Sequence, residues 1–395
     1  MMKIMQIVDH FGPYGGLERF VYDFSRQLQM QGHETWVAAM ELDEQHAWGK
    51  EPIRAQHMGE DSQGWREAAR RFEPDLLLWH AGAGSAEIVR ELTAVAPLAA
   101  VVHGPVCPSG TRLFRDRDEV CCHPSGPACL LRWYQRKCGT HPEPWAALAA
   151  LGRAGRMIRT LRLAQRVYTV SESLRGFLEI EGIAQQRLHV FDNTLGTLGS
   201  EFPPLEPADR HDSLRLLFAG RVVYGKGAQY FLDAVRLLVD RCVPVDATIV
   251  GDGWYLEKLK RRCSELGLAR RVRFVGQVPG FAMNEWYDQA DVLVVPSIWP
   301  EPAGLVVPEG RQRGKPVVVF DSGGLAEWGG YMDGIYVARH ADAAHLADKI
   351  VEASVGRSGG PEAAHKRSWP RARIDLIGDL LAWTTPTIGK EGLRP

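Results

Sequence analysis

Hydrophobic and polar positions along the chain follow the order of a parallel α/β sheet. A short apolar run, Lys3 to Val8, leads into the glycine-rich stretch 12–16, and apolar residues then recur at helical spacing as far as Leu28. Gly32 ends this predicted helix, and residues 35–40 return to strand character. A strand, a glycine loop, a helix and a second strand in this order are the typical opening of a parallel sheet.

Apolar runs of strand length continue through both halves of the chain. Those of the first half span residues 76–79, 98–102, 167–170 and 187–190, and those of the second half span 214–218, 247–250, 272–275, 292–295, 317–320 and 335–337. Uninterrupted apolar runs indicate parallel strands that are covered on both faces. The stretch 196–212 between the two sets is proline-rich and has no helical period, so we interpret it as a domain linker.

This pattern predicts an α/β protein made of two Rossmann-like domains. A chain of 395 residues is too long for one compact α/β core and suits two domains of ordinary size. We expect a first domain at 1–197, a linker at 198–212 and a second domain at 213–371. The last amphipathic stretch, about Asp375 to Trp383, could pack on either domain.

Composition narrows the class of protein further. A net charge of −1 excludes a globally basic nucleic-acid binder, and 45% hydrophobic with 24% charged residues is typical of a soluble globular protein. No apolar run approaches the ~18 to 20 residues that span a bilayer. The short apolar start runs straight into a strand pattern, which is not the form of a signal peptide. We therefore expect a cytoplasmic protein.

Two glycine turns in the second half follow predicted strands. Gly220-Arg221 and then Lys226 come after the strand 214–218, where glycine lets the backbone approach a ligand and the two cations can neutralise a diphosphate. A basic surface turn would have the same sequence. Residues 250–253, Val-Gly-Asp-Gly, form part of a dinucleotide fingerprint but lack its third glycine and the acid that holds a ribose, which disfavours NAD.

A pair of glutamates carries the most specific chemical signal. Glu301 and Glu309 follow the strand 291–296 and are eight residues apart, so they would share one face if the segment between them were helical. One carboxylate could then hold sugar hydroxyls and the other ribose hydroxyls, while amides near Gly304 and Leu305 could meet phosphate. A charged surface helix is the alternative, but the residues between the two acids are apolar.

As a set, these motifs resemble glycosyltransferase family 4, the retaining group with the GT-B fold. The family's Gly-Arg…Lys-Gly element, Val-Gly-x-Gly turn and Glu-x7-Glu motif match residues 220–227, 250–253 and 301–309. The first half matches the family's glycine loop, its strand-end histidine, its strand-end serine and its pre-linker asparagine. These matches stand at Gly15-Gly16-Leu17-Glu18, Val102-His103-Gly104, Val170-Ser171-Glu172-Ser173 and Asp192-Asn193.

The resemblance implies a role for each matching residue. Arg221 and Lys226 would bind the diphosphate and stabilise the leaving group, Glu301 would hold the donor sugar, and His103 would contact its distal hydroxyls. Glu309 would hold the ribose. The expected donor-binding residues are Gly15, Gly16, Gly220, Gly251, Gly276, Gln277, Val278, Gly304, Leu305, Val306 and Glu309.

The resemblance also implies an architecture and a reaction. Two Rossmann-like domains would face each other across a cleft, with a C-terminal helix at 372–395 packing back on the first domain and Trp369 near the crossing. A hexose would pass with retention from a UDP- or GDP-sugar to a glycan, lipid-linked or small-molecule acceptor, and the departing phosphate would take the acceptor's proton. No cofactor or catalytic metal is expected, because Arg and Lys already face the phosphates.

Other readings of the chemistry stay open. The chain could bind a nucleotide-sugar as a partner protein without transferring anything, or it could be a GT-B sugar-nucleotide epimerase. The donor base, the sugar, the acceptor and the pathway cannot be read from the residues, because sugar choice depends on a few hydroxyl contacts and acceptor loops vary freely.

The cysteines raise the question of a structural metal. Five of the seven fall between Cys107 and Cys138, a distribution that favours thiols or a metal over a disulfide framework. Cys107, Cys121, Cys129 and Cys138 could hold a structural zinc ion, although tight Cys-x2-Cys pairs are missing. Free thiols that shape an acceptor loop are the alternative.

Three further patterns are interpreted as structural. The Asp-x-Asp at residues 116–118, a metal-binding pattern in other sugar transferases, lies in an irregular stretch of the first half and is taken as coincidence. Residues 323–327 favour a plain helix start. A basic amphipathic stretch could touch an anionic surface such as the inner membrane, although a solvated helix face is the usual reading. Its arginines are Arg153, Arg156, Arg159 and Arg162.

Overall fold

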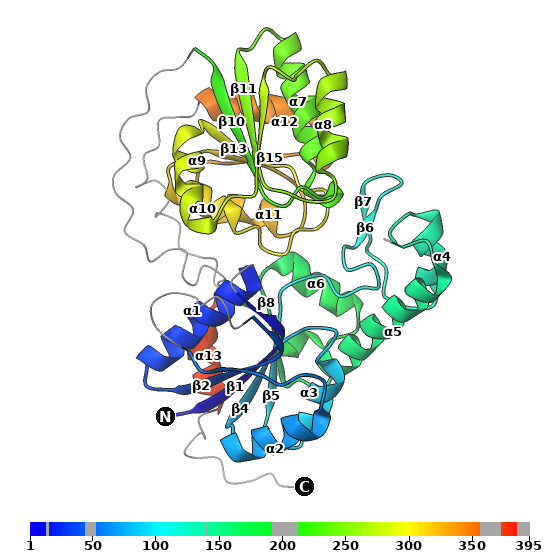
Figure 1. Cartoon of the computed structure of the whole chain (residues 1–395), viewed down its shortest axis with the longest axis vertical. Helices are drawn as coiled ribbons and strands as arrows, with labels where there is room; N and C mark the ends of the chain where they lie inside the picture. Colours follow the sequence, from blue (N-terminus) through cyan, green and yellow to red (C-terminus); the bar gives the residue numbers. More distant parts are fainter. Residues whose placement is uncertain (13–15, 44–52, 140, 192–211, 356–372, 385–395) are drawn as a thin grey trace.

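The computed structural model contains two parallel sheets, each covered by helices, one in each half of the chain (Figure 1). It describes residues 1–12, 16–43, 53–139, 141–191, 212–355 and 373–384. The predicted linker lies almost wholly outside these residues, as do Gly15, Asn193 and Trp369. The α/β class with two Rossmann-like domains is confirmed.

The first sheet, as far as it is described, has eight strands in the order β16-β9-β8-β5-β4-β1-β2-β3. All of its pairings are parallel, and β16 comes from the far end of the chain to pair with β9. The strands are β1 (Lys3–Phe11), β2 (Glu34–Leu42), β3 (Ala55–His57), β4 (Leu76–His80), β5 (Leu98–Val102), β8 (Arg166–Thr169), β9 (Leu188–Phe191) and β16 (Arg373–Ile374).

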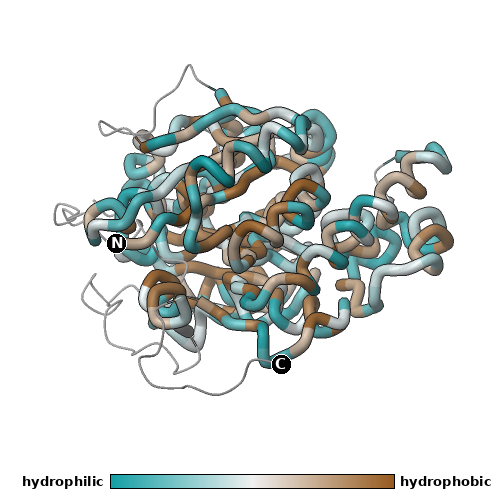
Figure 2. The backbone as a smooth tube through the Cα atoms, turned by 90° about the horizontal axis from the view of Figure 1, so that it is seen from below, coloured by the Kyte–Doolittle hydropathy of each residue, from teal (hydrophilic) through white to brown (hydrophobic). Residues whose placement is uncertain are grey.

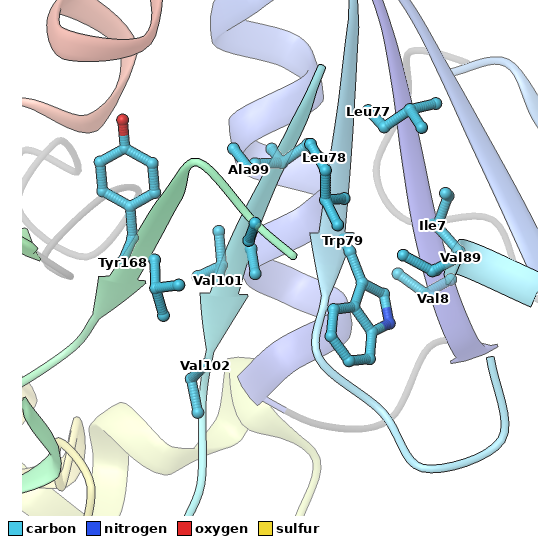
Figure 3. Close-up of a cluster of buried hydrophobic side chains, with 14 of the residues drawn as sticks. Ile7, Val8, Leu77, Leu78, Trp79, Val89, Ala99, Val101, Val102 and Tyr168 are labelled. Carbon is cyan, nitrogen blue, oxygen red and sulfur yellow. The ribbon is translucent and has the colours of Figure 1, made fainter. Parts of the chain in front are cut away.

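The centre of this sheet is apolar on both faces, as its uninterrupted hydrophobic runs predict. All five residues of β4 and all five of β5 are buried. Figure 3 shows Trp79 of β4 in this core, between Val101 of β5 on one side and Val8 of β1 on the other. The hydropathy colouring of Figure 2 shows the same distribution, with brown segments inside and teal segments mostly on outer helices and loops.

The second sheet has six described strands in the order β12-β11-β10-β13-β14-β15, again all parallel. The order reverses next to β10, so the loops after β10 and β13 diverge and leave a crevice at the carboxyl ends of the strands. The strands are β10 (Leu214–Ala219), β11 (Val245–Val250), β12 (Val272–Gly276), β13 (Val292–Val295), β14 (Val317–Phe320) and β15 (Ile335–Ala338).

Helices cover both sheets (Figure 1). In the first half they are α1 (Gly16–Met30), α2 (Ser62–Phe72), α3 (Ala86–Leu92), α4 (Ala128–Gln135), α5 (Pro144–Leu161), α6 (Glu172–Ile180) and the short η1 (Gln185–Arg187). In the second half they are η2 (Tyr224–Lys226), α7 (Ala228–Asp240), α8 (Leu256–Glu265), η3 (Gly280–Ala282), α9 (Met283–Gln289), α10 (Val306–Gln312), α11 (Gly324–Glu327), η4 (Trp328–Gly330) and α12 (Ala343–Val355).

The last described helix, α13 (Leu376–Thr384), belongs to the first domain. Leu376, Ile377 and Leu380 are buried in the first hydrophobic core, and Asp379 accepts hydrogen bonds from Arg166 (2.8 Å) and Tyr168 (2.6 Å) on β8. The chain therefore returns to the first domain after completing the second.

A cysteine-rich insert projects from the first domain between β5 and α5. We use this name for residues 104–139 and 141–143, which contain the antiparallel pair β6 (Leu113–Phe114) and β7 (Glu119–Val120) and the helix α4. Its anchor is the buried Arg112, whose guanidinium bonds Glu181 and the carbonyls of Cys121 and His123. In Figure 1 the insert rises beside the second domain.

The two domains also meet directly beneath the second sheet. Glu327 at the end of α11 accepts the backbone N–H groups of Glu172 (3.1 Å) and Ser173 (2.8 Å) and so caps the N-terminus of α6. A Cβ on Gly324 would stand 3.0 Å from the Cβ of Ser171 and 2.3 Å from the Pro302 carbonyl, so the approach leaves no room for a side chain. Sequence reasoning interpreted 323–327 only as a helix start and did not predict this contact.

Candidate active site

A pocket of about 660 Å³ opens at the carboxyl ends of the strands in the second domain. It lies beside the point where the strand order reverses, which is where open α/β sheets bind their ligands. The structure brings many of the predicted donor-binding residues to its wall, together with residues that were not predicted. The lining residues are Ala219, Gly220, Arg221, Val250, Gly251, Asp252, Gly253, Gln277, Val278, Met283, Tyr287, Val306 and Glu309.

The turn after β11 can form only with glycine. Gly251 has φ +136°, and a Cβ there would lie 1.9 Å from the carbonyl oxygen of Gly220. Its N–H donates to the Gly276 carbonyl at 2.8 Å, which joins the ends of β11 and β12. Because no side chain intervenes, the loops after β10 and β11 pack backbone to backbone and form the floor of the pocket.

Glu309 on α10 points its carboxylate at this pocket. Its Oε2 accepts a hydrogen bond from the Tyr287 hydroxyl of α9 at 2.8 Å. Burial raises the pKa of Glu309, an effect that the Tyr287 hydrogen bond and the positive charge of Arg19 only partly offset. Arg19 belongs to α1 of the first domain, so its charge reaches Glu309 across the cleft.

Arg221 supplies the positive charge of the pocket. Its side chain is exposed and lines the cavity, and none of the carboxylates in the described part of the chain forms a salt bridge with it. A guanidinium in this position can bind phosphate oxygens in a bidentate manner.

Lys226 and Glu301 form an ion pair next to the pocket. The Lys226 Nζ lies 2.8 Å and 2.7 Å from the two carboxylate oxygens of Glu301, and the Trp299 indole N–H donates to the same carboxylate at 2.6 Å. Burial by itself would raise the pKa of Glu301, but the charge and hydrogen bond of Lys226 and the bond from Trp299 lower it overall. Glu301 is therefore ionised at neutral pH, and Lys226 keeps one N–H for another acceptor.

The relation between the two glutamates differs from the prediction. The helix α10 begins at Val306, so Glu301 lies in the preceding loop. The condition for a shared helical face, a helix over the whole segment, is not met, because Gly304 breaks the segment with φ +65°. A Cβ there would stand 2.4 Å from Leu325, and the bend turns Glu301 toward Lys226 while Glu309 faces Tyr287.

His103 follows β5 in the first domain and belongs to a chain of buried hydrogen bonds. Burial lowers the pKa of His103 to about 3 and lowers that of His80 well below its usual value, so both rings are neutral at pH 7. The His80 Nδ1 lies 3.2 Å from the His103 Nε2, and the His80 Nε2 lies 2.9 Å from the Gln6 Oε1.

The direction of these bonds follows from the far end of the chain. The Ser25 hydroxyl donates to the Val21 carbonyl at 2.7 Å, so it accepts from the Gln6 amide N–H at 2.7 Å. The Gln6 oxygen then accepts from His80 Nε2–H, which leaves His80 Nδ1 to accept from His103 Nε2–H. His103 consequently carries its proton on Nε2, and its Nδ1 is an acceptor.

The remaining predicted residues are placed as follows. Gly16 begins α1, and a Cβ on it would lie 3.8 Å from the Leu305 side chain across the cleft. Leu305 precedes α10 and packs against the first core. Gly276 ends β12 with φ +85° and holds the Gly251 turn rather than lining the pocket.

Several residues of this region gave no signal in the sequence. Tyr287, Trp299 and Arg19 bond or act on the two glutamates, and His80 with Gln6 orients His103. They come from elements far apart in the chain, and no motif joins them. The apolar character of β4 hid His80, which is the last residue of an otherwise hydrophobic strand.

The four cysteines proposed as zinc ligands gather around one cavity of about 20 Å³. Burial and the neighbouring thiols raise the pKa of Cys138 to about 11, with contributions from Cys107, Cys121 and Cys129. The donor set suits zinc, but within the described residues no three or more His, Cys, Asp or Glu side chains form a group that could hold a metal ion. The structural zinc ion therefore stays a prediction, and no role for one is derived.

The patterns interpreted as structural lie in stabilising contacts. Asp116 pairs with Arg136 at 2.9 Å, and Asp118 accepts from the Tyr224 hydroxyl at 2.8 Å. The basic stretch lies on α5, with Arg153 and Arg159 exposed. Over the described ranges, the structure has no helix long and apolar enough to cross a membrane.

Comparison with known proteins agrees with this architecture. The model of Glycosyltransferase Family 4 matches residues 14–195, and that of Glycosyl transferases group 1 matches residues 213–354, so together they cover both domains. The chain belongs to the glycosyltransferases of the GT-B type with these two domains.

Two individual relatives match shorter parts of the chain. The chain is 38% identical over 116 residues to an uncharacterized glycosyltransferase of Methanocaldococcus jannaschii, covering 29% of each chain. It is 35% identical over 177 residues to the D-inositol 3-phosphate glycosyltransferase of Streptomyces griseus, covering 40% of this chain and 36% of the relative. These matches span less than two-fifths of either relative.

A solved structure covers more of the chain. The crystal structure of Anabaena HepE in complex with UDP superimposes with a TM-score of 0.65 at 18% identity, over 91% of this chain and 92% of that one. At this identity the likeness shows the fold, which is GT-B.

Proposed function

We propose that the protein is a retaining hexosyltransferase that uses a UDP- or GDP-sugar and needs neither a cofactor nor a catalytic metal. One observation carries this proposal. Four charged residues lie at the carboxyl ends of the strands of the second sheet, namely Arg221, Lys226, Glu301 and Glu309. Similar structures give additional support, since HepE was solved in complex with UDP and with UDP-glucose.

Each polar side chain of the site binds a different part of the donor. Glu309 accepts the ribose hydroxyls, Arg221 binds the diphosphate, and the free N–H of Lys226 reaches the phosphate nearer the sugar. Glu301 holds sugar hydroxyls while it keeps Lys226 in place. The neutral His103 accepts a hydrogen bond from a sugar hydroxyl through Nδ1, because its Nε2–H is committed to His80.

The transfer step then depends on electrostatics and positioning. The bond between the anomeric carbon and the diphosphate oxygen breaks, a bond from the acceptor oxygen forms on the same face, and the acceptor's proton passes to the departing phosphate. Negative charge grows on the diphosphate during this step, and preorganised cations lower the barrier by stabilising that charge.

A screen of UDP-, GDP- and ADP-sugars by thermal shift identifies the donor, because a ligand at 100 times its Kd adds about 2.7 kcal/mol to stability. Slow hydrolysis of that donor, followed by proton NMR, should first release the sugar with the donor's own anomeric configuration. Release of the opposite anomer would rule out retention. An isomeric nucleotide-sugar would instead identify an epimerase, and binding without any release would identify a partner protein.

We also propose a class of acceptor and a cellular location for the reaction. A glycan, a lipid-linked or a small-molecule acceptor suits the open cleft. The reaction would take place in the cytoplasm, with the exposed arginines of α5 in contact with the inner membrane surface. Cosedimentation with anionic vesicles at low salt tests the membrane contact, and a protein that stays in the supernatant would contradict it.

A further inference from the structure

A second cavity, of about 560 Å³, lies between the cysteine-rich insert and the second domain. The insert contributes one wall, and the loops after β10 and β11 with the start of α8 contribute the other. The residues that define its chemistry are Arg115, Trp133, Lys137, Tyr224, Trp254 and Lys258. None of the residues assigned to the donor lines it.

Specific contacts hold the two walls together. Asp118 on the insert accepts hydrogen bonds from the hydroxyls of Tyr224 (2.8 Å) and Tyr230 (2.5 Å) in the second domain. The Asp118 carbonyl lies 2.6 Å from the His340 Nε2. Burial, followed by the bond to Asp118, raises the pKa of both tyrosines, so they remain neutral donors. The insert is therefore positioned on the second domain by three polar contacts to one residue.

The electrostatic character of the cavity is one-sided. Its described lining includes three cations, Arg115, Lys137 and Lys258, and no carboxylate. Of the nearby acids, Asp116 and Glu119 bind Arg136 (2.9 Å and 2.7 Å), and Asp118 accepts from the Tyr224 and Tyr230 hydroxyls. Asp118 therefore offsets at most one of the three positive charges. Arg115 donates to the carbonyls of Lys137 and Gly139, so no acid neutralises it there. The site has unbalanced positive charge that suits an anion.

Aromatic rings supply the rest of the surface. The Trp254 side chain is 68% exposed and Tyr134 is 46% exposed, although large aromatic side chains are costly to leave in water. Trp254 and Tyr255 stand edge to face with their ring centroids 5.5 Å apart, and the Lys258 Nζ lies 5.6 Å from the Tyr255 ring centroid. Aromatic faces beside cations can stack on the C–H face of a pyranose and bind its charged substituent.

Residues that are adjacent in the sequence line this cavity and the donor pocket. Gly253 lines the donor pocket, and the next residue, Trp254, lines the second cavity. Likewise Tyr224 lies two residues before Lys226, in the same short helix η2. A saccharide bound here would contact residues that neighbour the donor-binding residues in the sequence.

We propose that this cavity binds an anionic saccharide, a pyranose with a carboxylate or phosphate, as part of the acceptor. The inference rests on the proposed function, since it assigns a substrate class to the same enzyme. The cations bind the anion and the aromatic side chains stack on the sugar ring, while Asp118 keeps the insert closed against the second domain.

Calorimetric titration of the full chain saturated with its nucleoside diphosphate tests the proposal. The probes are tetragalacturonic acid for the carboxylate, glucose 6-phosphate for the phosphate, and maltotetraose as the neutral control. At least one anionic probe should bind, more weakly as salt rises, and maltotetraose should bind at least tenfold more weakly. The double variant Lys137→Gln/Lys258→Gln and the single variant Trp254→Ala should each raise the Kd of that probe about tenfold.

The matched control is Lys260→Gln, which removes the same charge from the same helix. Lys260 pairs with Glu257 and is not part of the cavity wall, so this variant should bind the probe like the wild type. The proposal is overturned if neither anionic probe binds, if maltotetraose binds equally well, or if the lining variants change nothing. Titration of UDP and GDP alone separates the two ideas: nucleotide binding without saccharide binding removes only this inference, and loss of both removes the proposed function.

Discussion

The two sides of the cleft stabilise polar groups in opposite ways. On the first domain, His103, His80 and Gln6 form a chain of neutral hydrogen bonds that excludes charge. On the second domain, Lys226 and Glu301 form a charged pair, and Arg221 stands beside them without a carboxylate partner in the described part of the chain.

The difference follows from what each side would contact. A sugar hydroxyl is neutral before and after transfer, so a neutral acceptor of fixed tautomer suits it. A leaving diphosphate gains negative charge, and fixed cations stabilise that gain. The comparison therefore predicts that charge changes on the second domain slow the reaction most, whereas changes on the first domain alter orientation.

Removing Lys226 tests the charged side with the largest expected effect. Lys226→Ala should lower kcat by ~10²-fold or more, because the leaving group loses a preorganised cation. The measurement is the rate of nucleoside diphosphate release from the donor that the thermal-shift screen identifies. Lys349→Ala, which removes a half-buried lysine of α12 that pairs with Glu352, is the control and should leave kcat unchanged. Normal turnover by Lys226→Ala would falsify the electrostatic account.

Glu309 sharpens the comparison within the second domain, since its expected role is in binding rather than in turnover. Glu309→Gln should raise the Kd of the nucleoside diphosphate about tenfold, because hydrogen bonds to a charged acceptor contribute about 1.5–3 kcal/mol. Titration calorimetry measures this change. A 2′,3′-dideoxy nucleotide is the control, and the wild type and the variant should bind it equally. Equal loss of affinity for both nucleotides would place Glu309 away from the ribose.

The neutral side is tested by removing the residue that orients His103. His80→Phe keeps an aromatic ring but removes the acceptor for His103 Nε2–H, so kcat should fall about three- to tenfold, as for one neutral hydrogen bond. Nitrogen-15 NMR of the imidazoles should show His103 protonated on Nε2 in the wild type and a mixture of tautomers in the variant. His57→Phe, at an exposed position of the same sheet, is the control. An unchanged His103 tautomer in His80→Phe would contradict the proposed chain.

Much of the fold could be predicted because buried parallel strands carry a strong local signal. The run 317–320 coincides with β14, and 214–218 differs from β10 by one residue. The elements that were missed are short and sit at edges. β3 has three residues with two of them exposed, and β6 and β7 have two residues each, so no apolar run marks them. Their pairing depends on tertiary packing.

The site could be predicted only where a motif keeps its residues together in sequence. Arg221, Gly251 and Glu309 line one pocket because each follows a strand of the same sheet. Tyr287 and Arg19 could not be assigned, since their relation to Glu309 is set by the packing of α9 and by the docking of the first domain. The bend at Gly304 also separates the two acids, so the helical spacing of Glu301 and Glu309 does not describe their positions.

The smallest expected effect concerns the stability of the protein without ligand. Glu309 and Glu301 should change this stability in opposite directions. The folded pKa of Glu309 is raised by burial, so ionisation disfavours the fold as pH rises through that value. Glu309→Gln should therefore be more stable than the wild type at pH 7, as shown by a higher Tm. The gain should vanish below the unfolded value of about 4.3.

Glu301 has the opposite sign. Lys226 and Trp299 hold its folded pKa below the ordinary value despite burial, so its contribution is present above the unfolded pKa and is lost as pH falls through the folded one. Glu301→Gln should accordingly lower the Tm at pH 7, and the loss should shrink toward acid pH. Thermal unfolding of both variants at pH 7 and pH 4.5 decides the matter. The contacts of the two acids differ, because Glu301 is held by the cation Lys226, whereas Glu309 is held only by the Tyr287 hydroxyl and the distant charge of Arg19. A shift of Tm in the same direction for both variants would contradict this difference.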